Sequence, residues 1–276
     1  MSDPRSGCDW GFSIARLRGR IGRVEVRRMN RIPEILVWLL FAGAAAAQTS
    51  EGPQPMVVDP GGPGKAPSDA IVLFDGKDNS HWMTMDGKPS KCTVATGVMI
   101  CRTGAGDTQS TEKFRDAQMH VEFNLPYEPE MRGQGRANSG VILMGRYEIQ
   151  ILDSYQNPTY ANGSCAALYG QSEPLVNACR RPGEWQTYDI VFHAPHCAAD
   201  GTVETPGSLT MLHNGVLVQD HVSVRGRRCV AGEGPIVLQD HSQYVGRKIG
   251  TAAGVTEGAP DTTIRFRNIW MRGLSQ

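Results

Sequence analysis

Short runs of apolar or alternating residues recur between residues 71 and 271, and nearly all are bounded by Gly, Pro, Asn or Asp. Runs of this kind, separated by turn-forming residues, predict β-strands. No window of 11 residues has the i, i+3, i+4, i+7 spacing of an amphipathic helix, so we expect almost no helix. The runs are Ile71–Phe74, Val98–Cys101, Ala117–Leu125, Val141–Met144, Tyr147–Leu152, Trp185–Ala194, Leu209–His213, Val216–Gln219, Ile236–Gln239 and Ile264–Met271.

Two of these regions give the clearest local signals. Apolar and polar residues alternate strictly in Ala117–Leu125, which predicts a strand with one buried face. Asn214-Gly215 separates two apolar runs, and this dipeptide favours a tight hairpin because both turn residues accept positive φ. Many antiparallel strands in about 200 residues predict an all-β fold, a jelly-roll sandwich of two antiparallel sheets with little helix.

Residues 29–47 have the pattern of a secretory signal peptide. A basic start is followed by the apolar run Ile35–Phe41 and by small residues up to Ala47. The 13 residues of Ile35–Ala47 are too few to span a bilayer, which takes about 20 helical residues. We therefore expect export to the periplasm or the medium, cleavage after Ala47, and no transmembrane anchor in the mature chain.

The segments on either side of this peptide carry no predicted fold. Met1–Arg28 is Arg-rich and without periodicity, and we expect translation to begin at Met29; a genuine, disordered basic extension is the alternative. Residues 48–70 contain five prolines and four glycines, which predicts a flexible linker. One folded domain would then span residues 71–274.

Charge and cysteine content agree with an exported protein. The formal net charge is zero for the whole chain, and cleavage after Ala47 would leave 20 basic and 24 acidic residues, so we expect no nucleic-acid partner. Six cysteines would remain, an even number that suits a disulfide framework in an oxidising compartment. The simplest pairs are Cys92 with Cys101, Cys165 with Cys179, and Cys197 with Cys229, although other connectivities are open.

The stretch Gly133–Tyr155 places polar residues inside a predicted strand. Tyr147, Ile149 and Ile151 would point to one face, and Glu148 and Gln150 to the other. Such a face is often simply solvated. It offers a carboxylate and an amide for binding or catalysis only if other polar groups meet it.

A second strand repeats this design. In Pro235–His241 the alternation puts Gln239 and His241 on one face and Ile236 and Leu238 on the other. If both strands belong to one sheet, Glu148, Gln150, Gln239 and His241 would line a polar cleft suited to hydroxyl-rich ligands.

Several segments resemble a known family, the 3-keto-disaccharide hydrolase domain. They are FDGKDNSHW, GQGRANSGVILMGRYEIQILDSY, NACRRPGEWQTYDIVFHAP, TMLHNGVLV, GPIVLQDH and IRFRNIWMR, in this order. The resemblance covers about Ile71–Leu274 and implies a concanavalin A-like sandwich, export to the bacterial cell envelope, and action on sugars oxidised at carbon 3. The chain departs from the family pattern in a Gly- and Ala-rich insertion, Ser242–Asp261, which we expect beside the cleft.

A 3-keto group acidifies the hydrogen on carbon 2, so the glycosidic oxygen can leave by elimination and water can then add. This chemistry needs a base near carbon 2, an acid near the leaving oxygen and a donor or Lewis acid on the keto oxygen. We expect Glu148 as the base and His241 as the acid or a metal ligand, which leaves a divalent metal as an open cofactor with Glu148 and His241 as its candidate ligands. Substrate-binding candidates are Arg136, Asn138, Gln150, Gln239 and Asp153, although Arg136 and Asp153 could simply pair with each other.

Two other functions remain open. Glu148 and Asp153 have the outer spacing of the E-x-D-x-x-E motif of retaining glucanases, although the middle acid is replaced by Gln150. A non-catalytic carbohydrate-binding module would use Tyr155, Tyr169 and Trp185 to stack on sugar rings.

Overall fold

The computed structural model describes residues 52, 54–62, 64–226, 229, 231–244, 248–251, 254–257 and 262–274. The predicted extension Met1–Arg28 and the signal peptide at residues 29–47 lie outside these residues. The chain divides into the units Met1–Pro55 and Met56–Gln276, and every strand belongs to the second. No α-helix occurs in the described part of the chain, and none of its helices is long and apolar enough to cross a membrane.

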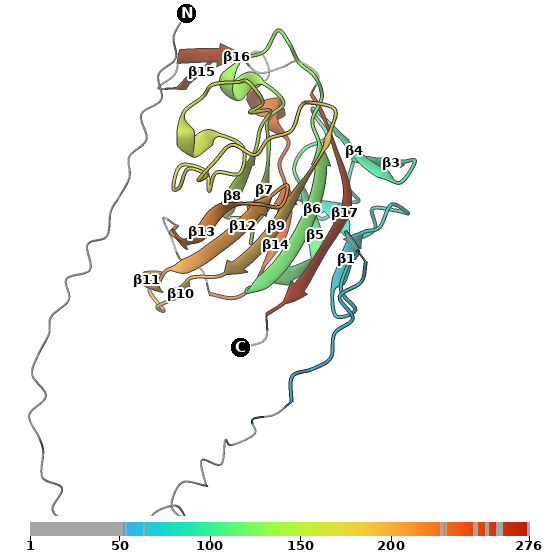
Figure 1. The fold of residues 1–276 in the computed structure, drawn as a ribbon, viewed down its shortest axis with the longest axis vertical. Helices are drawn as coiled ribbons and strands as arrows, with labels where there is room; N and C mark the ends of the chain where they lie inside the picture. Colours follow the sequence, from blue (N-terminus) through green and yellow to red (C-terminus); the bar gives the residue numbers. More distant parts are fainter. Residues whose placement is uncertain are drawn as a thin grey trace, which may run out of the picture. The chain divides into compact units, whose positions relative to one another are not determined.

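Two antiparallel sheets make up the fold, which confirms the predicted sandwich (Figure 1). The larger sheet has the order β13-β12-β9-β6-β17-β4-β3, with β1 also paired to β17. Its strands are β1 (Ile71–Phe74), β3 (Thr93–Ala95), β4 (Val98–Arg102), β6 (Ala117–Asn124), β9 (Trp185–His193), β12 (Gly207–His213), β13 (Val216–Val224) and β17 (Thr263–Gly273).

The smaller sheet carries the region singled out in the sequence. Its order is β2-β5-β14-β7-β8. Its strands are β2 (Trp82–Thr84), β5 (Thr108–Phe114), β7 (Ser139–Leu143), β8 (Tyr147–Ile151) and β14 (Gly234–Leu238). The remaining elements are β10 (His196–Cys197), β11 (Val203–Thr205), β15 (Lys248–Thr251) and β16 (Gly254–Glu257), with the 3₁₀ turns η2 (Gly133–Gly135), η3 (Ala161–Gly163) and η4 (His241–Tyr244).

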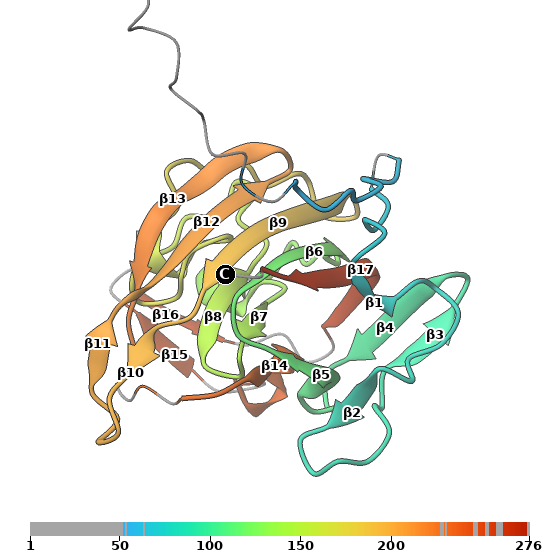
Figure 2. The same ribbon diagram turned by 90° about the horizontal axis from the view of Figure 1, so that it is seen from below.

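The core lies between the two sheets, which face each other in Figure 2. Rings from both sheets meet there, since Phe192 of β9 lies 5.8 Å from Tyr147 of β8 and 6.3 Å from Phe114 of β5 between centroids. Apolar side chains at alternate positions of most strands fill this space, as the period of two requires.

The strand β6 confirms the predicted alternation and differs on its outer face. Val121 and Phe123 are fully buried against the core. On the other face Glu122 is also buried, because its carboxylate pairs with Arg267 Nε at 2.6 Å and accepts a hydrogen bond from Asn268 Nδ2 at 2.9 Å. A buried polar face is possible here because its charges are paired.

Two further sequence features, the Asn214-Gly215 turn and the segment before β1, are seen in the structure. Asn214 and Gly215 have φ of 53° and 80°, as the predicted hairpin between β12 and β13 requires. In the Pro- and Gly-rich segment before β1, the Asp69 carboxylate pairs with Arg272 at 2.6 Å and Gly64 O accepts from Asn268, so part of this segment lies along β17.

Two of the three expected disulfides are present. Cys92 is bonded to Cys101, and Cys197 to Cys229. The expected Cys165–Cys179 disulfide is not formed in this structure, where both are free thiols, although the two side chains are in hydrogen-bond contact with each other. Each sulfur has another neighbour: Cys165 Sγ lies 3.1 Å from Tyr188 Oη, and Cys179 Sγ lies 3.5 Å from Gln186 Nε2.

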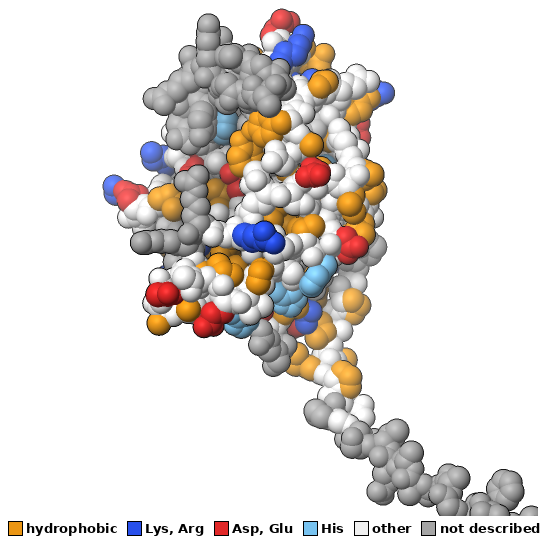
Figure 3. Space-filling view, turned by 90° about the vertical axis from the view of Figure 1, so that its left-hand side faces the viewer, with side chains coloured by type: hydrophobic (Ala, Val, Ile, Leu, Met, Phe, Trp, Pro, Cys, Tyr) orange, Lys and Arg blue, Asp and Glu red, His pale blue; other side chains and the backbone are white. Residues whose placement is uncertain are grey.

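Figure 3 shows how charged side chains are distributed over one face of the molecule. Basic side chains stand singly there, with acidic, apolar and histidine side chains between them.

Candidate active site

A pocket lies on the outer face of the smaller sheet, away from the core. Glu148 of β8 is opposite Ile142 of β7 in the register, and Gln150 is opposite Gly140. On the other side of β7, Gln239 N donates to Gly140 O at 3.0 Å. The pocket has a volume of about 110 Å³ and is lined by Gln134, Asn138, Glu148, Gln150, Tyr169, Gln239 and His241.

Gly140 lies opposite Gln150 and next to Gln239 in the smaller sheet, beneath the Glu148 side chain. A Cβ atom at this position would lie 3.0 Å from both Cγ and Oε1 of Glu148, closer than side-chain atoms normally approach. The missing side chain therefore lets the Glu148 carboxyl lie across β7. Any larger residue at position 140 would collide with this carboxyl.

Glu148 is a half-buried carboxyl with an altered proton affinity. Burial raises the pKa of Glu148 to about 7, and the nearby negative charge of Asp107 adds to the effect. A carboxyl with this pKa can exchange a proton near neutral pH, which is the property of a general acid or base.

Gln150 is buried under a set of amides. Its Nε2 donates to Gln134 Oε1 at 3.0 Å and to Asn138 Oδ1 at 3.2 Å. Asn138 Nδ2 in turn donates to Gln134 O at 2.7 Å. The loop around η2 thus covers the outer face of β8, so Glu148 and Gln150 are not on a solvated face.

His241 enters the pocket from a 3₁₀ turn and not from a strand. β14 ends at Leu238, so Gln239, Asp240 and His241 lie beyond the strand, although Gln239 and His241 still line one pocket. The chain turns because Asp240 binds a neighbouring loop: Asp240 Oδ2 accepts from Gly104 N at 2.9 Å and from Gly106 N at 2.7 Å. Burial lowers the pKa of His241 to about 4, so His241 is neutral at pH 7.

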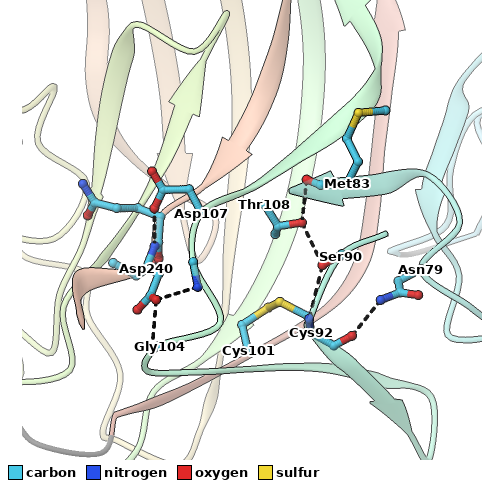
Figure 4. Close-up of a disulfide and its surroundings, with 12 residues drawn as sticks. Asn79, Met83, Ser90, Cys92, Cys101, Gly104, Asp107, Thr108 and Asp240 are labelled. Atoms are coloured by element: carbon cyan, nitrogen blue, oxygen red, sulfur yellow. Dashed lines mark hydrogen bonds between the residues drawn. A yellow bond between two sulfur atoms is a disulfide. The ribbon is translucent and has the colours of Figure 1, made fainter. Parts of the chain in front are cut away.

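The loop held by Asp240 is braced from its other side. The Asp107 carboxylate accepts from Asp240 N at 2.7 Å, and the Cys92–Cys101 disulfide joins the strands that lead into this region (Figure 4). These contacts fix the path of the chain between the end of β14 and His241.

Gln239 brings an unsatisfied acceptor to the pocket. Its backbone is held on both sides, since Gln239 N donates to Gly140 O and Gln239 O accepts from Ser139 Oγ at 2.8 Å. Its Oε1 is buried and has no hydrogen-bond partner among the described residues. A hydroxyl group of a bound ligand would satisfy this atom.

Two of the predicted substrate-binding residues lie outside the pocket. Arg136 Nε and Asp153 Oδ2 are 2.7 Å apart as an ion pair, although not aligned as a hydrogen bond, and both residues are buried. Burial raises the pKa of Asp153, against the lowering effect of Arg136. Asp153 is fully buried and β8 ends at Ile151, so Glu148 and Asp153 do not face each other across a cleft as the carboxylates of a retaining glucanase do.

Sequence reasoning missed Gln134 as a pocket residue. It lies in a Gly-Gln-Gly loop with no strand pattern, and only its contacts across the sheet reveal it. Of the three aromatic residues proposed to stack on sugars, only Tyr169 lines the pocket. Tyr155 lies under Arg181, and Trp185 under Arg267, at 5.7 and 4.0 Å between the guanidinium carbon and the ring centroid.

Two side chains of metal-ligating type meet in the pocket. Glu148 and His241 are the two candidate ligands that share the pocket, and no group of three or more His, Cys, Asp or Glu side chains able to hold a metal ion occurs in the described part of the chain. Protein-bound zinc usually has at least three such ligands.

Comparison with known proteins agrees with the sequence resemblance. The family model of the 3-keto-alpha-glucoside-1,2-lyase-like domain matches residues 69–272. A presumed glycosyl hydrolase from Parabacteroides distasonis ATCC 8503 has a crystal structure that is 41% identical, with a TM-score of 0.73, over 83% of this chain and 97% of that chain. A second one from the same organism is 16% identical, with a TM-score of 0.49, over 75% of this chain and 94% of that chain, and a likeness this distant carries no information on chemistry.

No curated protein matches the chain at a significant level. The family model nevertheless covers most of the chain, and the first of the similar structures is matched over nearly its whole length. The chain therefore belongs to the family of 3-keto-alpha-glucoside-1,2-lyase-like domains, a family of carbohydrate-cleaving enzymes.

Proposed function

We propose that this protein is an exported enzyme that cleaves glycosides oxidised at carbon 3, by elimination across carbons 1 and 2 and by hydration of the product. The observation that carries the proposal is the pair Glu148 and His241, which share one pocket and have pKa values displaced in opposite directions. Residues with displaced pKa values in one cleft are the usual sign of acid–base catalysis.

The proposed reaction begins with removal of the proton on carbon 2, which the 3-keto group acidifies. The C2–H electron pair forms the C1=C2 double bond, and the C1–O bond to the leaving group breaks. The leaving oxygen takes a proton, which releases an alcohol or a second sugar. Water can then add across the double bond of the enone, and the net result is hydrolysis.

The pKa values favour a reversal of the roles expected from the sequence. Because the pKa of His241 is about 4, its imidazole is neutral at pH 7 and can only accept a proton. Because the pKa of Glu148 is about 7, a large fraction of its carboxyl is protonated at that pH and can donate. We therefore assign His241 as the base and Glu148 as the acid.

The rest of the pocket suits a neutral, hydroxyl-rich ligand. Its other polar side chains are the amides of Gln134, Asn138, Gln150 and Gln239 and the phenol of Tyr169. Amides donate and accept hydrogen bonds without adding charge, as hydroxyl and keto oxygens require. We expect substrate hydroxyls to bind Asn138 and Gln239, because both line the pocket and Gln239 Oε1 has no hydrogen-bond partner among the described residues.

Export is part of the proposal and has separate support. Two disulfides are present in the described domain, and structural disulfides persist in oxidising compartments. N-terminal sequencing of the protein from a bacterial host would locate cleavage, which we expect after Ala47.

Incubation of the purified protein with a disaccharide and with its 3-keto form tests the activity. We expect cleavage of the keto sugar alone, with a transient enone absorbing in the ultraviolet, and loss of turnover in Glu148→Gln. Glu173→Gln, at an exposed carboxylate, is the matched control and should keep full activity. Cleavage of the plain disaccharide would contradict the proposal, and binding without turnover would identify a binding module.

A further inference from the structure

The amides of the pocket form a chain whose direction is fixed at one end. Gln134 is 2% exposed, and its Nε2 lies 2.7 Å from Gly163 O and 3.0 Å from Thr159 Oγ1. A backbone carbonyl can only accept, so the nitrogen of the Gln134 amide must face Gly163. Its oxygen, Oε1, must therefore face the pocket interior.

This oxygen sets the direction of the next amide. Gln134 Oε1 lies 3.0 Å from the end of Gln150, and because Oε1 can only accept, the atom of Gln150 that faces it is the nitrogen. Asn138 gives a second, independent constraint. Its Nδ2 donates to the backbone oxygen of Gln134 at 2.7 Å, which leaves Asn138 Oδ1 facing the same Gln150 nitrogen at 3.2 Å.

The oxygen of Gln150 then faces Glu148. The two Oε1 atoms are 3.0 Å apart, and the Gln150 oxygen is also 3.1 Å from Ser139 O. If the Gln150 amide were turned, its nitrogen would donate to Glu148 and Ser139, but its oxygen would face Gln134 Oε1 at 3.0 Å and Asn138 Oδ1 at 3.2 Å. Turning the amide would remove the oxygen–oxygen contacts with Glu148 and Ser139 but create two new ones with Gln134 and Asn138. When Glu148 is protonated, turning the amide therefore brings no gain in hydrogen bonding.

A proton on Glu148 resolves the contact. A protonated carboxyl donates one hydrogen bond, and a separation of 3.0 Å between two oxygens is within hydrogen-bond range only when one of them carries the hydrogen. We propose that Gln134 is a positioning residue: it fixes the direction of the Gln150 amide so that Gln150 accepts a hydrogen bond from Glu148, which holds a proton when substrate arrives.

Among the described residues, the other groups around Glu148 favour its protonated form or carry no charge. From the β5 side, the negative charge of Asp107 favours the protonated form. From η4, His241 is neutral, and from the loop after η3 comes the phenol of Tyr169. β7 contributes Gly140 and no charged group at this point. The proton-donor role of Glu148 rests on the proposed function, whereas the hydrogen-bond directions do not.

A titration of the free protein tests the inference without substrate. In protein labelled with ¹³C at the glutamate carboxyls, the Glu148 signal is the one missing from Glu148→Gln. We expect its midpoint close to pH 7 in the wild type. In Gln134→Met only Asn138 Oδ1 still holds the Gln150 nitrogen, so the amide turns more readily to donate to the carboxylate. The midpoint should then fall by about one pH unit or more, a tenfold loss of proton affinity.

The matched control is Thr159→Val. It removes one partner of the Gln134 nitrogen and leaves Gly163 O to fix the amide direction, so the Glu148 midpoint should stay at the wild-type value. A merely structural role of Gln134 would leave the midpoint unchanged in Gln134→Met as well, and that result would overturn the inference. A wild-type midpoint near 4.5, the ordinary value, would overturn it too.

Two further outcomes are defined in advance. If circular dichroism shows that Gln134→Met does not fold, Asn138→Leu removes the other acceptor facing Gln150 and must shift the midpoint in the same direction; no shift there refutes the inference. If the titrations behave as expected but the 3-keto sugar is not cleaved, the proposed function fails and the positioning role of Gln134 stands.

Discussion

Replacing Glu148 with glutamine should make the protein more stable at alkaline pH while it abolishes turnover. Burial and Asp107 raise the pKa of Glu148 from 4.5 to about 7 in the folded chain. Because the folded-state pKa lies above the unfolded one, the contribution of the protonated carboxyl to stability is fully present below about pH 4.5 and is lost as the pH rises through 7. Glutamine does not titrate, so the variant does not suffer this loss.

The size of the effect follows from the pKa difference. At about 1.4 kcal/mol for each pH unit, a rise from 4.5 to about 7 corresponds to roughly 3 kcal/mol, and solvent contact at the half-buried carboxyl reduces it to about 2–3 kcal/mol. For a domain of about 200 residues this is a difference in Tm on the order of 5–10 °C.

Thermal unfolding followed by circular dichroism at pH 4.5 and pH 8 measures this difference. We expect Glu148→Gln to gain 2–3 kcal/mol over the wild type between about pH 4.5 and pH 8, and the exposed control Glu173→Gln to show no such change. An equal Tm difference at the two pH values would refute the reasoning, because it would mean that Glu148 ionises as easily in the folded chain as in the unfolded one. A gain of stability together with a loss of activity is expected where a catalytic group is held in an environment that disfavours its charged form.

Three further predictions address the site. Gly140→Ala should lower kcat about tenfold or more with little loss of Tm, because the added methyl group displaces the Glu148 carboxyl; an unchanged kcat would show that the position of Glu148 is not critical. With Glu148 as the acid, kcat/KM should fall about tenfold for each pH unit above 7, and a rise there would assign Glu148 as the base. Asp153→Asn should cost about 3 kcal/mol in urea unfolding, because it leaves Arg136 buried without its partner, and should change kcat much less.

The strands with alternating apolar residues were predicted from the sequence, whereas strands with polar residues at inward positions were missed. β5 was not expected, because its inward positions include Thr108 and Ser110 in place of apolar residues. These hydroxyls are satisfied by distant partners: Ser110 Oγ accepts from Ile236 N at 3.0 Å, and Thr108 Oγ1 donates to Ser90 Oγ at 2.8 Å. A polar residue can face the core when its side chain is hydrogen-bonded. Here the partners are distant in the sequence, so these hydrogen bonds cannot be predicted before the strand pairing is known.

The candidate site divides in the same way. Strand periodicity alone placed Glu148 and Gln150 on one face, and the sheet order then brought Gln239 beside them. The place of His241 could not be predicted, because the turn at Asp240 depends on the amides of Gly104 and Gly106, more than 130 residues away in the chain. The Ser242–Asp261 insertion contains β15 and β16, and β16 lies beside η2, the turn that carries Gln134.

Two features turn the outer face of this sheet into a candidate binding site: one residue has no side chain, and two loops cover the face. Gly140 has no side chain and so leaves room for the Glu148 carboxyl, and the loops that carry Gln134 and Tyr169 line the same pocket. Among the described residues this cover consists of amides and a phenol, which withdraw Glu148 from water and supply no positive charge. Burial therefore raises the pKa of Glu148, where a neighbouring arginine would lower it. Arg136 does not join the pocket lining, because its guanidinium pairs with Asp153, so within the described residues no arginine opposes the protonation of Glu148 at neutral pH.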